Sequence, residues 1–201
     1  MSGGFFLYSE SPILTPSKRT DPVGFMVSGG EIVNPPIFRR GCISIDEEGG
    51  VGIERVDPVG WRVKFQNYTD GNGFVITSVN GLSNPGGGGR SSDFGTLYNR
   101  GYNTSVIVPS GSIGYGIVGS TVVSVSEVTG ELDVPLNGCV VITSVSSGSS
   151  GSSGSMGGMG GVGERVEWVQ PEGGGIIEAM AGGPMLVKDG EMVLERDVEV
   201  S

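Results

Sequence analysis

The segment Ala179-Met-Ala-Gly-Gly-Pro-Met-Leu-Val-Lys-Asp-Gly190 joins a glycine-rich turn to a β-hairpin signal. Met185–Val187 is a short apolar run, and the Asp-Gly pair that follows is a strong signal for a tight hairpin turn. We therefore expect Met192–Leu194 to return as the second strand. Gly182 and Gly183 have no side chain, so another group can approach their backbone closely. The segment predicts a β-hairpin preceded by a Gly-Gly turn whose backbone is not covered by side chains.

The composition of the chain favours strands over helices. The 201 residues include 39 Gly and 11 Pro, and charged residues make up only 17%. Each interior Gly costs a helix roughly 1 kcal/mol relative to Ala, whereas short Val-, Ile- and Leu-rich runs bounded by Gly, Ser and Asn are typical of strands. We predict one α+β, strand-dominated domain over 1–201, with mixed or antiparallel sheets and few short helices. Ile176–Ala181 is the segment in which we expect a helical turn.

Apolar runs separated by turn residues predict a series of strands. The low-complexity run Gly148–Gly163 cannot bury enough apolar surface to offset the entropy of ordering it, so it predicts a flexible, exposed insert. We expect Met1–Tyr8 and Cys139–Val145 to lie in the core. The other expected strands are Gly24–Val27, Glu31–Val33, Cys42–Ile45, Val51–Val56, Trp61–Gln66, Phe74–Val79, Ser105–Val108, Gly114–Val118, Thr121–Val125, Leu132–Pro135 and Glu164–Val169.

Charge and residue usage exclude several classes of function. The net charge is −10 with no run of Lys or Arg, which argues against nucleic acid and anionic membranes as partners. The absence of His excludes His-ligated metals and Ser-His catalysis, and we expect neither a metal nor a cofactor. Cys42 and Cys139 could pair as a disulfide or stay free; both lie in apolar runs, which favours buried free thiols. No segment is apolar enough to span a bilayer and no signal peptide follows Met1, which leaves an intracellular chain, a missing leader or another export route.

An ordered series of motifs covers most of the chain and resembles the phosphodiester glycosidase domain. That family includes the lysosomal "uncovering enzyme", an N-acetylglucosamine-1-phosphodiester α-N-acetylglucosaminidase, and bacterial and viral relatives. Its members are mostly secreted or lumenal, and the resemblance also allows a virion-associated protein. The order of the motifs carries the resemblance. They are Ser2-Gly-Gly-Phe-Phe6, Pro22-Val-Gly24, Pro35-Pro36, Val79-Asn-Gly81, Arg90, Leu97-Tyr-Asn-Arg100, Asn103-Thr104, Val134-Pro-Leu-Asn-Gly-Cys-Val-Val141 and Ala181-Gly-Gly-Pro-Met-Leu-Val187.

Two departures from the family pattern bear on activity. Ser2 stands where members usually have Asn, and the family's Leu-Asp-Gly-Gly-Gly-Ser loop, which follows the Gly-Gly-Pro hairpin, has no equivalent before Ser201. The resemblance therefore implies that this chain corresponds to the N-terminal portion of such a domain, or to a diverged member.

The chemistry of a sugar phosphodiester selects the candidate binding residues. A phosphate suits a guanidinium fork, and a leaving oxygen needs an acid. The candidates for substrate binding are Arg90, Arg100, Asn80, Tyr98, Gly182 and Gly183, with Arg39 and Arg40 as alternative cations. Asp93 and Asp189 are the candidate carboxylates, although turn chemistry explains Asp189 as well, and no residue is identified as the general acid.

Three functions remain open. The first is a phosphodiester glycosidase completed by a further segment or second chain. The second is a non-catalytic structural or assembly module, for example of a virion or surface layer, which self-associates through Phe5–Leu7. The third is a carbohydrate-binding module without turnover.

Overall fold

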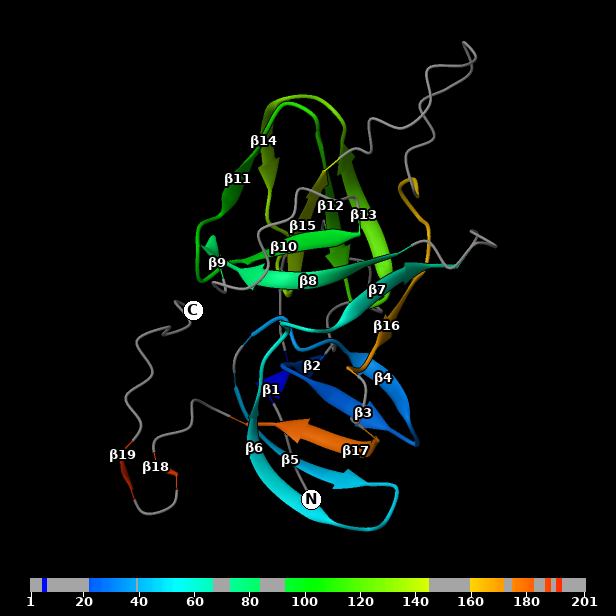
Figure 1. Ribbon diagram of the computed structural model, residues 1–201, viewed down its shortest axis with the longest axis vertical. Helices are drawn as coiled ribbons and strands as arrows, with labels where there is room; N and C mark the ends of the chain where they lie inside the picture. Colours follow the sequence, from blue (N-terminus) through cyan, green and yellow to red (C-terminus); the bar gives the residue numbers. More distant parts are fainter. Residues whose placement is uncertain are drawn as a thin grey trace. The chain divides into compact units, whose positions relative to one another are not determined.

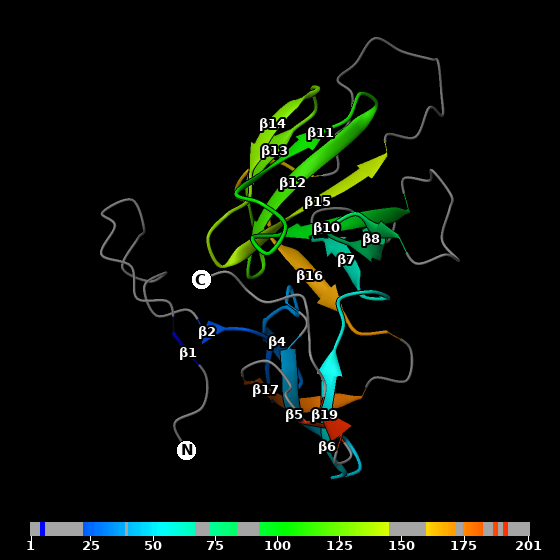
Figure 2. The same ribbon diagram turned by 90° about the vertical axis from the view of Figure 1, so that its left-hand side faces the viewer.

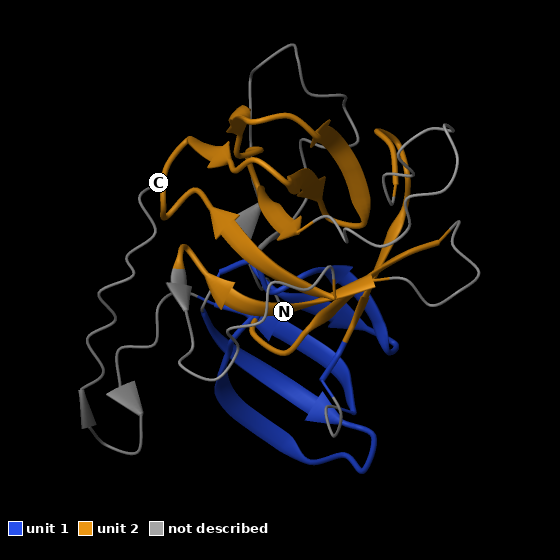
Figure 3. Ribbon diagram, turned by 45° about the horizontal axis from the view of Figure 1, so that its top comes forward, with its two compact units in different colours: residues 1–58, 170–201 blue, residues 59–169 orange. Residues whose placement is uncertain are grey.

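A computed structural model describes residues 5–6, 22–38, 40–66, 73–83, 93–144, 160–171, 175–182, 187–188 and 191–192. The chain divides into two compact units, shown in Figure 3: unit 1 comprises Met1–Pro58 and Gln170–Ser201, and unit 2 comprises Val59–Val169. The described residues form strands and turns and no helix. The β-rich character is confirmed, whereas the described part contains none of the few short helices that were expected. The single-domain organisation over 1–201 stays a prediction.

Unit 1 is built around a five-stranded sheet with the strand order β4-β3-β17-β5-β6, visible in Figure 1. All neighbouring strands are antiparallel. β17 is the last of these five strands in the sequence, and it lies between β3 and β5. Two short pairs accompany the sheet, β1 with β2 and β18 with β19. The bounds are β1 Phe5–Phe6, β2 Pro22–Val23, β3 Met26–Ser28, β4 Glu31–Asn34, β5 Arg40–Asp46, β6 Val51–Val56, β17 Ile176–Ala181, β18 Val187–Lys188 and β19 Glu191–Met192.

The expectation of a helical turn at Ile176–Ala181 is wrong, because this segment is the central strand β17. Ala, Met and Glu favour helices locally, but here the backbone pairs with β3 on one side and β5 on the other. Tertiary pairing therefore overrides helix propensity. Two contacts hold the C-terminal end of β17 close to its neighbours. Gly182 N–H donates to Gly41 O at 2.9 Å. Gly24 packs against Ala181, since a Cβ on Gly24 would lie 3.0 Å from the Ala181 Cβ.

Both predicted hairpins of unit 1 are confirmed. Ser28 pairs with Glu31, and the two glycines between them have positive φ angles of 60° and 80°. Lys188 pairs with Glu191, and these two residues flank the Asp-Gly pair in the sequence; the strands are shifted from the expected bounds. The intervening Asp189 lies outside the described residues, as do the side chains of β18 and β19.

Unit 2 contains an eight-stranded sheet whose main path runs β13-β12-β15-β10-β8-β7-β16, with β9 paired to β8. The pairs along it are antiparallel, except that β8 and β10 run parallel. A separate ribbon of β11 and β14 lies beside β12, as Figures 1 and 2 show. The bounds are β7 Arg62–Phe65, β8 Gly73–Val79, β9 Leu82–Ser83, β10 Phe94–Asn99, β11 Ser105–Val108, β12 Ser112–Val118, β13 Thr121–Ser126, β14 Gly130–Asp133, β15 Gly138–Ser144 and β16 Val166–Val169.

The sheet of unit 2 curls until its two outer strands meet. At the start of β13, Val122 N–H donates to Glu164 O at 2.9 Å, and just before β16 a bridge joins Arg165 to Thr121. Aromatic rings from separate parts of the sheet consequently pack together inside. Phe65 lies 5.9 Å from Phe74 and 5.1 Å from Tyr115, measured between ring centroids.

The core of unit 2 confirms part of what the sequence predicts for β15. Cys139, Val140 and Val141 are completely buried. Cys139 and Cys42 are both free and buried, as expected. The expected exposure of Gly148–Gly163 can be followed only at its end, because residues 148–159 lie outside the described part. Residues 161–163 are exposed as expected, whereas Gly160 is buried against the Phe65 ring. The expected core position of Met1–Tyr8 falls on side chains outside the described part.

Candidate functional site

Three of the sequence-predicted binding residues lie at one end of the unit 2 sheet. Asn80 follows β8, Tyr98 lies near the end of β10, and Arg100 follows β10. Because β8 and β10 are parallel neighbours, their C-terminal ends meet at the same edge of the sheet. We refer to Tyr98, Arg100 and Tyr102 as the tyrosine site.

Asn80 has a positioning role in the structure. Its Nδ2 donates to Asn99 Oδ1 at 3.0 Å, and its Oδ1 accepts the Asn99 backbone N–H at 3.1 Å. Asn99 Oδ1 also accepts the Gly101 N–H at 2.9 Å. The backbone of Asn80 has a φ of 54°, in the left-handed region that Asn tolerates better than most residues. The amide pair therefore fixes the turn that carries Arg100 and Tyr102.

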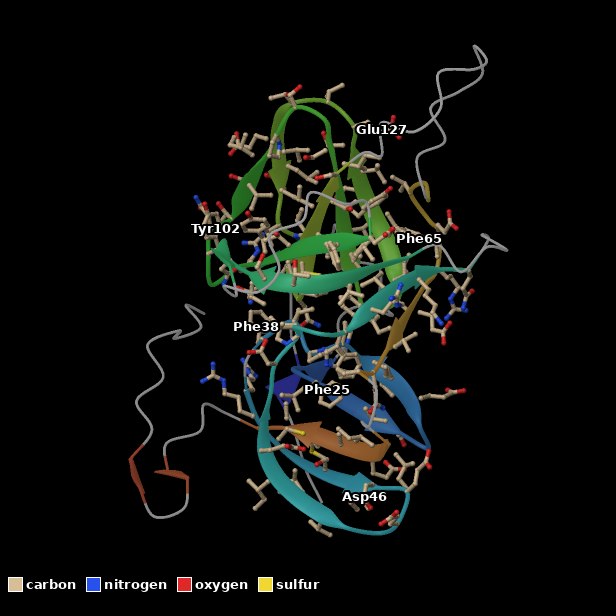
Figure 4. All side chains as sticks on the ribbon, in the orientation of Figure 1. Phe25, Phe38, Asp46, Phe65, Tyr102 and Glu127 are labelled. Carbon is tan, nitrogen blue, oxygen red and sulfur yellow. The ribbon has the colours of Figure 1, made fainter. Side chains whose placement is uncertain are left out.

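A pair of tyrosines forms the exposed surface of this edge. The Tyr98 and Tyr102 rings have centroids 5.1 Å apart at 62°, an edge-to-face contact. Tyr98 is half-buried and packs on the cluster of Val106, Val134 and Val140. Tyr102 is 54% exposed, and Figure 4 shows it at the periphery of unit 2. One ring is thus anchored in the core while the other faces solvent.

The hydroxyl of Tyr98 remains a proton donor at neutral pH. Burial, and secondly the neighbouring Tyr102, raise the pKa of Tyr98 above its usual value. A Cβ on Gly81 would lie 3.9 Å from the Tyr98 hydroxyl oxygen, so this hydroxyl sits beside bare backbone. A protonated phenol can donate to an oxygen of a bound sugar or phosphate.

Arg100 is anchored at one nitrogen. Its Nε donates to Val134 O at 3.1 Å, which ties the turn after β10 to the residue that follows β14. Among the described residues, Val134 O is the only hydrogen-bond acceptor of the Arg100 guanidinium. A guanidinium held this way retains the part of its fork that pairs with phosphate oxygens.

The other sequence-predicted residues lie in other parts of the chain. Asp93 precedes the opposite end of β10, where its carbonyl accepts the Val75 N–H. The six residues of β10 lie between it and Arg100, a separation of about 23 Å at the usual rise per residue. Gly182 belongs to unit 1 and pairs with Gly41. Arg90, Arg39, Gly183 and Asp189 lie outside the described residues.

Arg40 occupies a structural position in unit 1. Its guanidinium lies 5.6 Å from the centroid of the Phe38 ring, a cation–π contact. Burial lowers the pKa of Arg40 from its usual value. The acidic turn of unit 1 is structural too, because Asp46 Oδ1 accepts the N–H groups of Glu48 and Gly50. Across the described ranges, no three Cys, Asp or Glu side chains converge on a common point as metal ligands would.

Sequence reasoning missed Asn99 and Tyr102. Asn99 belongs to the Leu97-Tyr-Asn-Arg100 motif, and its side chain joins the ends of β8 and β10. Tyr102 lies in the Gly-Tyr-Asn turn after Arg100, and an aromatic residue in a glycine-flanked turn after a strand was the signal that could have found it.

Comparisons with known proteins bring no functional assignment. No protein-family model matches the chain, and no curated protein matches it. Among solved structures, a hypothetical protein from Synechocystis has 20% identity and a TM-score of 0.37, over 96% of this chain and 33% of that one. A protein from Burkholderia pseudomallei K96243 has 16% identity and a TM-score of 0.38, over 92% of this chain and 41% of that one. The chain thus spans 33% and 41% of the lengths of these two proteins. In the described part of the chain, no helix is long and apolar enough to cross a membrane.

Proposed function

We propose that unit 2 binds a carbohydrate, and specifically a sugar-1-phosphate diester, at the tyrosine site. The observation that carries this proposal is the exposed Tyr102 ring packed edge-on against Tyr98, next to the anchored Arg100. Tyrosine offers an apolar face for a sugar ring and a hydroxyl for its oxygens. Arginine supplies charge-assisted hydrogen bonds for a phosphate.

The resemblance to phosphodiester glycosidases supports the choice of ligand. Its motifs include Asn80, Tyr98 and Arg100, and these residues come from parts of the sequence that meet at one edge of the sheet. As a member of that family, the protein would have the α+β fold with few short helices that the sequence predicts. Binding is the function we propose first, because no described carboxylate has been assigned as the acid that hydrolysis requires.

The binding proposal is tested by calorimetric titration of the full chain with methyl N-acetyl-α-glucosamine-1-phosphate diester. Saturable binding is expected, and Tyr102→Ala should weaken it about tenfold, the loss of roughly 1.4 kcal/mol of contact. Phe94→Ala is the matched control, since Phe94 is an exposed aromatic residue at the opposite end of β10. Absence of binding, or equal affinities for the wild type and Tyr102→Ala, would refute the proposal.

Arg100 separates recognition of phosphate from recognition of sugar. Arg100→Gln should lower the affinity for the diester and leave the affinity for neutral methyl N-acetyl-α-glucosaminide unchanged, because only the diester carries a negative charge. Release of free sugar from the diester is measured in the same samples. Turnover that Arg100→Gln abolishes would establish the glycosidase function, whereas binding without release corresponds to a carbohydrate-binding module.

A non-catalytic assembly role is the second candidate, and a separate observation favours it. Unit 1 exposes large apolar side chains on adjacent strands of its sheet, including Ile43 and Ile53. These residues lie in a different unit from the tyrosine site, so the two functions are compatible.

A further inference from the structure

One face of the unit 1 sheet carries an apolar row that runs across four strands. Met26 pairs with Met180, Met180 pairs with Ile43, and Ile43 pairs with Ile53. Directly opposed residues of antiparallel strands lie on the same face, so these four side chains form a continuous row over β3, β17, β5 and β6. Its exposure increases toward β6, with Ile43 56% and Ile53 71% exposed. The row therefore ends at the edge of the sheet.

The two edges of this sheet differ in their protection. The β4 edge is four residues long, adjoins an irregularity between Met26 and Val27, and runs into Pro35-Pro36. Proline and irregular pairing are devices that prevent another strand from adding to an edge. The β6 edge is six residues long, Val-Gly-Ile-Glu-Arg-Val, without Pro or Lys. Both Val51 and Ile53 are 71% exposed, and in the described part of the chain β5 is the only strand that pairs with β6.

We propose that a second copy of this chain adds to β6 in antiparallel register centred on Ile53, which joins two five-stranded sheets across a two-fold axis. In this register Ile53 lies opposite Ile53 of the second copy, Val51 opposite Arg55, and Gly52 opposite Glu54. The apolar row then continues from one sheet into the other. An isologous contact of this kind closes after two copies and gives a dimer.

Charge and face select this register among the alternatives. If the pairing shifts by one residue, the buried face of one sheet lies on the same side of the joined sheet as the exposed face of the other. Centring on Glu54 or on Arg55 places two like charges directly opposite each other, which is destabilising. Centring on Gly52 pairs only the three residues from Val51 to Ile53. The register centred on Ile53 pairs Val51–Arg55 and places no like charges directly opposite each other.

Disulfide trapping of the full chain tests both the partner and the register. An Ile53→Cys variant should form a disulfide-linked dimer under mild oxidation, because opposed residues have Cα atoms about 4.5–5.5 Å apart, within the range that a disulfide spans. Val51→Cys is the matched control: it is equally exposed, but its copies would lie about 13 Å apart in this register. A mixture of Val51→Cys and Arg55→Cys should cross-link across chains. The native Cys42 and Cys139 are buried and free.

Sedimentation equilibrium supplies the second readout. The wild type should show a concentration-dependent monomer–dimer equilibrium, and Ile53→Lys should weaken it about tenfold or more by placing two ammonium groups at the two-fold axis. Ile107→Lys, at a position 65% exposed in unit 2, should leave it unchanged. A wild type that stays monomeric, whether its β6 is bare or covered by its own chain, overturns the proposal. So does a dimer that is insensitive to Ile53→Lys, or equal cross-linking at residues 51 and 53.

Discussion

Asn80 and Asn99 join the ends of two parallel strands through their side chains. The Asn80 amide donates to Asn99 Oδ1 and accepts the Asn99 N–H, at 3.0 and 3.1 Å. Asn80 also donates its own N–H to Leu97 O at 2.8 Å. These bonds hold together the ends of β8 and β10, where the tyrosine site lies. The stability of this end of the sheet and binding at the tyrosine site therefore depend on the same two residues, Asn80 and Asn99.

Replacing Asn80 should destabilise unit 2 in two separable ways. Asn80→Ala removes the side-chain bonds and forces Ala into a positive φ, which together should lower the unfolding free energy by about 2–4 kcal/mol. Asn80→Gly removes the same bonds but tolerates the φ of 54°, so it should cost about 1–2 kcal/mol less than the Ala variant. Urea unfolding measures both values. Equal stabilities for the two variants would show that the backbone conformation contributes nothing.

The close packing inside the unit 2 sheet predicts a steep cost for a single methyl group. A Cβ on Gly95 would lie 2.7 Å from Val141 Cγ1 and 2.9 Å from Phe74 Cδ2. Gly95→Ala should therefore lower the unfolding free energy by about 1–3 kcal/mol, the usual range for overpacking. Gly161→Ala is the control, because nothing described lies within 4 Å of its Cβ position. A thermal melt in which both variants match the wild type would contradict the packing described here.

Most strands of this protein could be predicted from the sequence because short-range signals specify them. Val51–Val56 and Ser105–Val108 have the expected bounds, since glycine- or serine-containing turns interrupt an apolar pattern on each side. The Ser28-Gly-Gly30 hairpin follows from glycines that can adopt positive φ. Ile176–Ala181 was misassigned because its partners, β3 and β5, are more than 120 residues earlier in the chain. Local propensity contains no information about such pairing.

The candidate site was predicted in its residue types but not in its geometry. Arginine and tyrosine were selected for their chemistry, and Tyr98 and Arg100 do lie at the same edge as Asn80. The position of Asn99 could not be predicted, because it depends on the parallel pairing of β8 with β10 and not on any motif. The same pairing assigns Asn80 to the support of the turn. Chemistry therefore selected candidate residues, and topology determined what each can contact.

The buried thiols predict a loss of stability at alkaline pH. Burial raises the pKa of Cys42 to about 11 and also raises the pKa of Cys139 above its usual value. In the unfolded chain thiols ionise near pH 8.5. Above that pH the native state holds protons that the unfolded state has lost, so stability is complete below about pH 8.5 and falls as the pH rises toward the folded pKa values.

The slope of this pH dependence can be assigned to one thiol. Cys139→Ala should reduce the loss of unfolding free energy between pH 9 and pH 10 by about 1 kcal/mol. The two proteins differ at this residue alone, so contributions common to both cancel in the difference. Reaction with a thiol reagent supplies an independent check: two thiols should react in denaturant and neither should react rapidly in the native protein at pH 8. Parallel pH profiles for wild type and variant would exclude Cys139 as the titrating group.

The meeting of the two outer strands of unit 2 depends on Trp168. Its Nε1 donates to Gly119 O at 2.9 Å, which fastens β16 to the turn between β12 and β13. Val166 N–H donates to Ser120 O at 3.0 Å beside it, so the indole bond and the backbone bond act on the same junction. Trp168→Phe keeps an aromatic ring but leaves the part-buried Gly119 carbonyl without this donor, and should lower the unfolding free energy by about 1 kcal/mol. Native-state hydrogen exchange should show faster exchange at Val166 and Val122 than at Val141 in the centre of the sheet. If the variant loses stability with uniform exchange throughout unit 2, the junction is not a separate opening unit and Trp168 contributes only through packing.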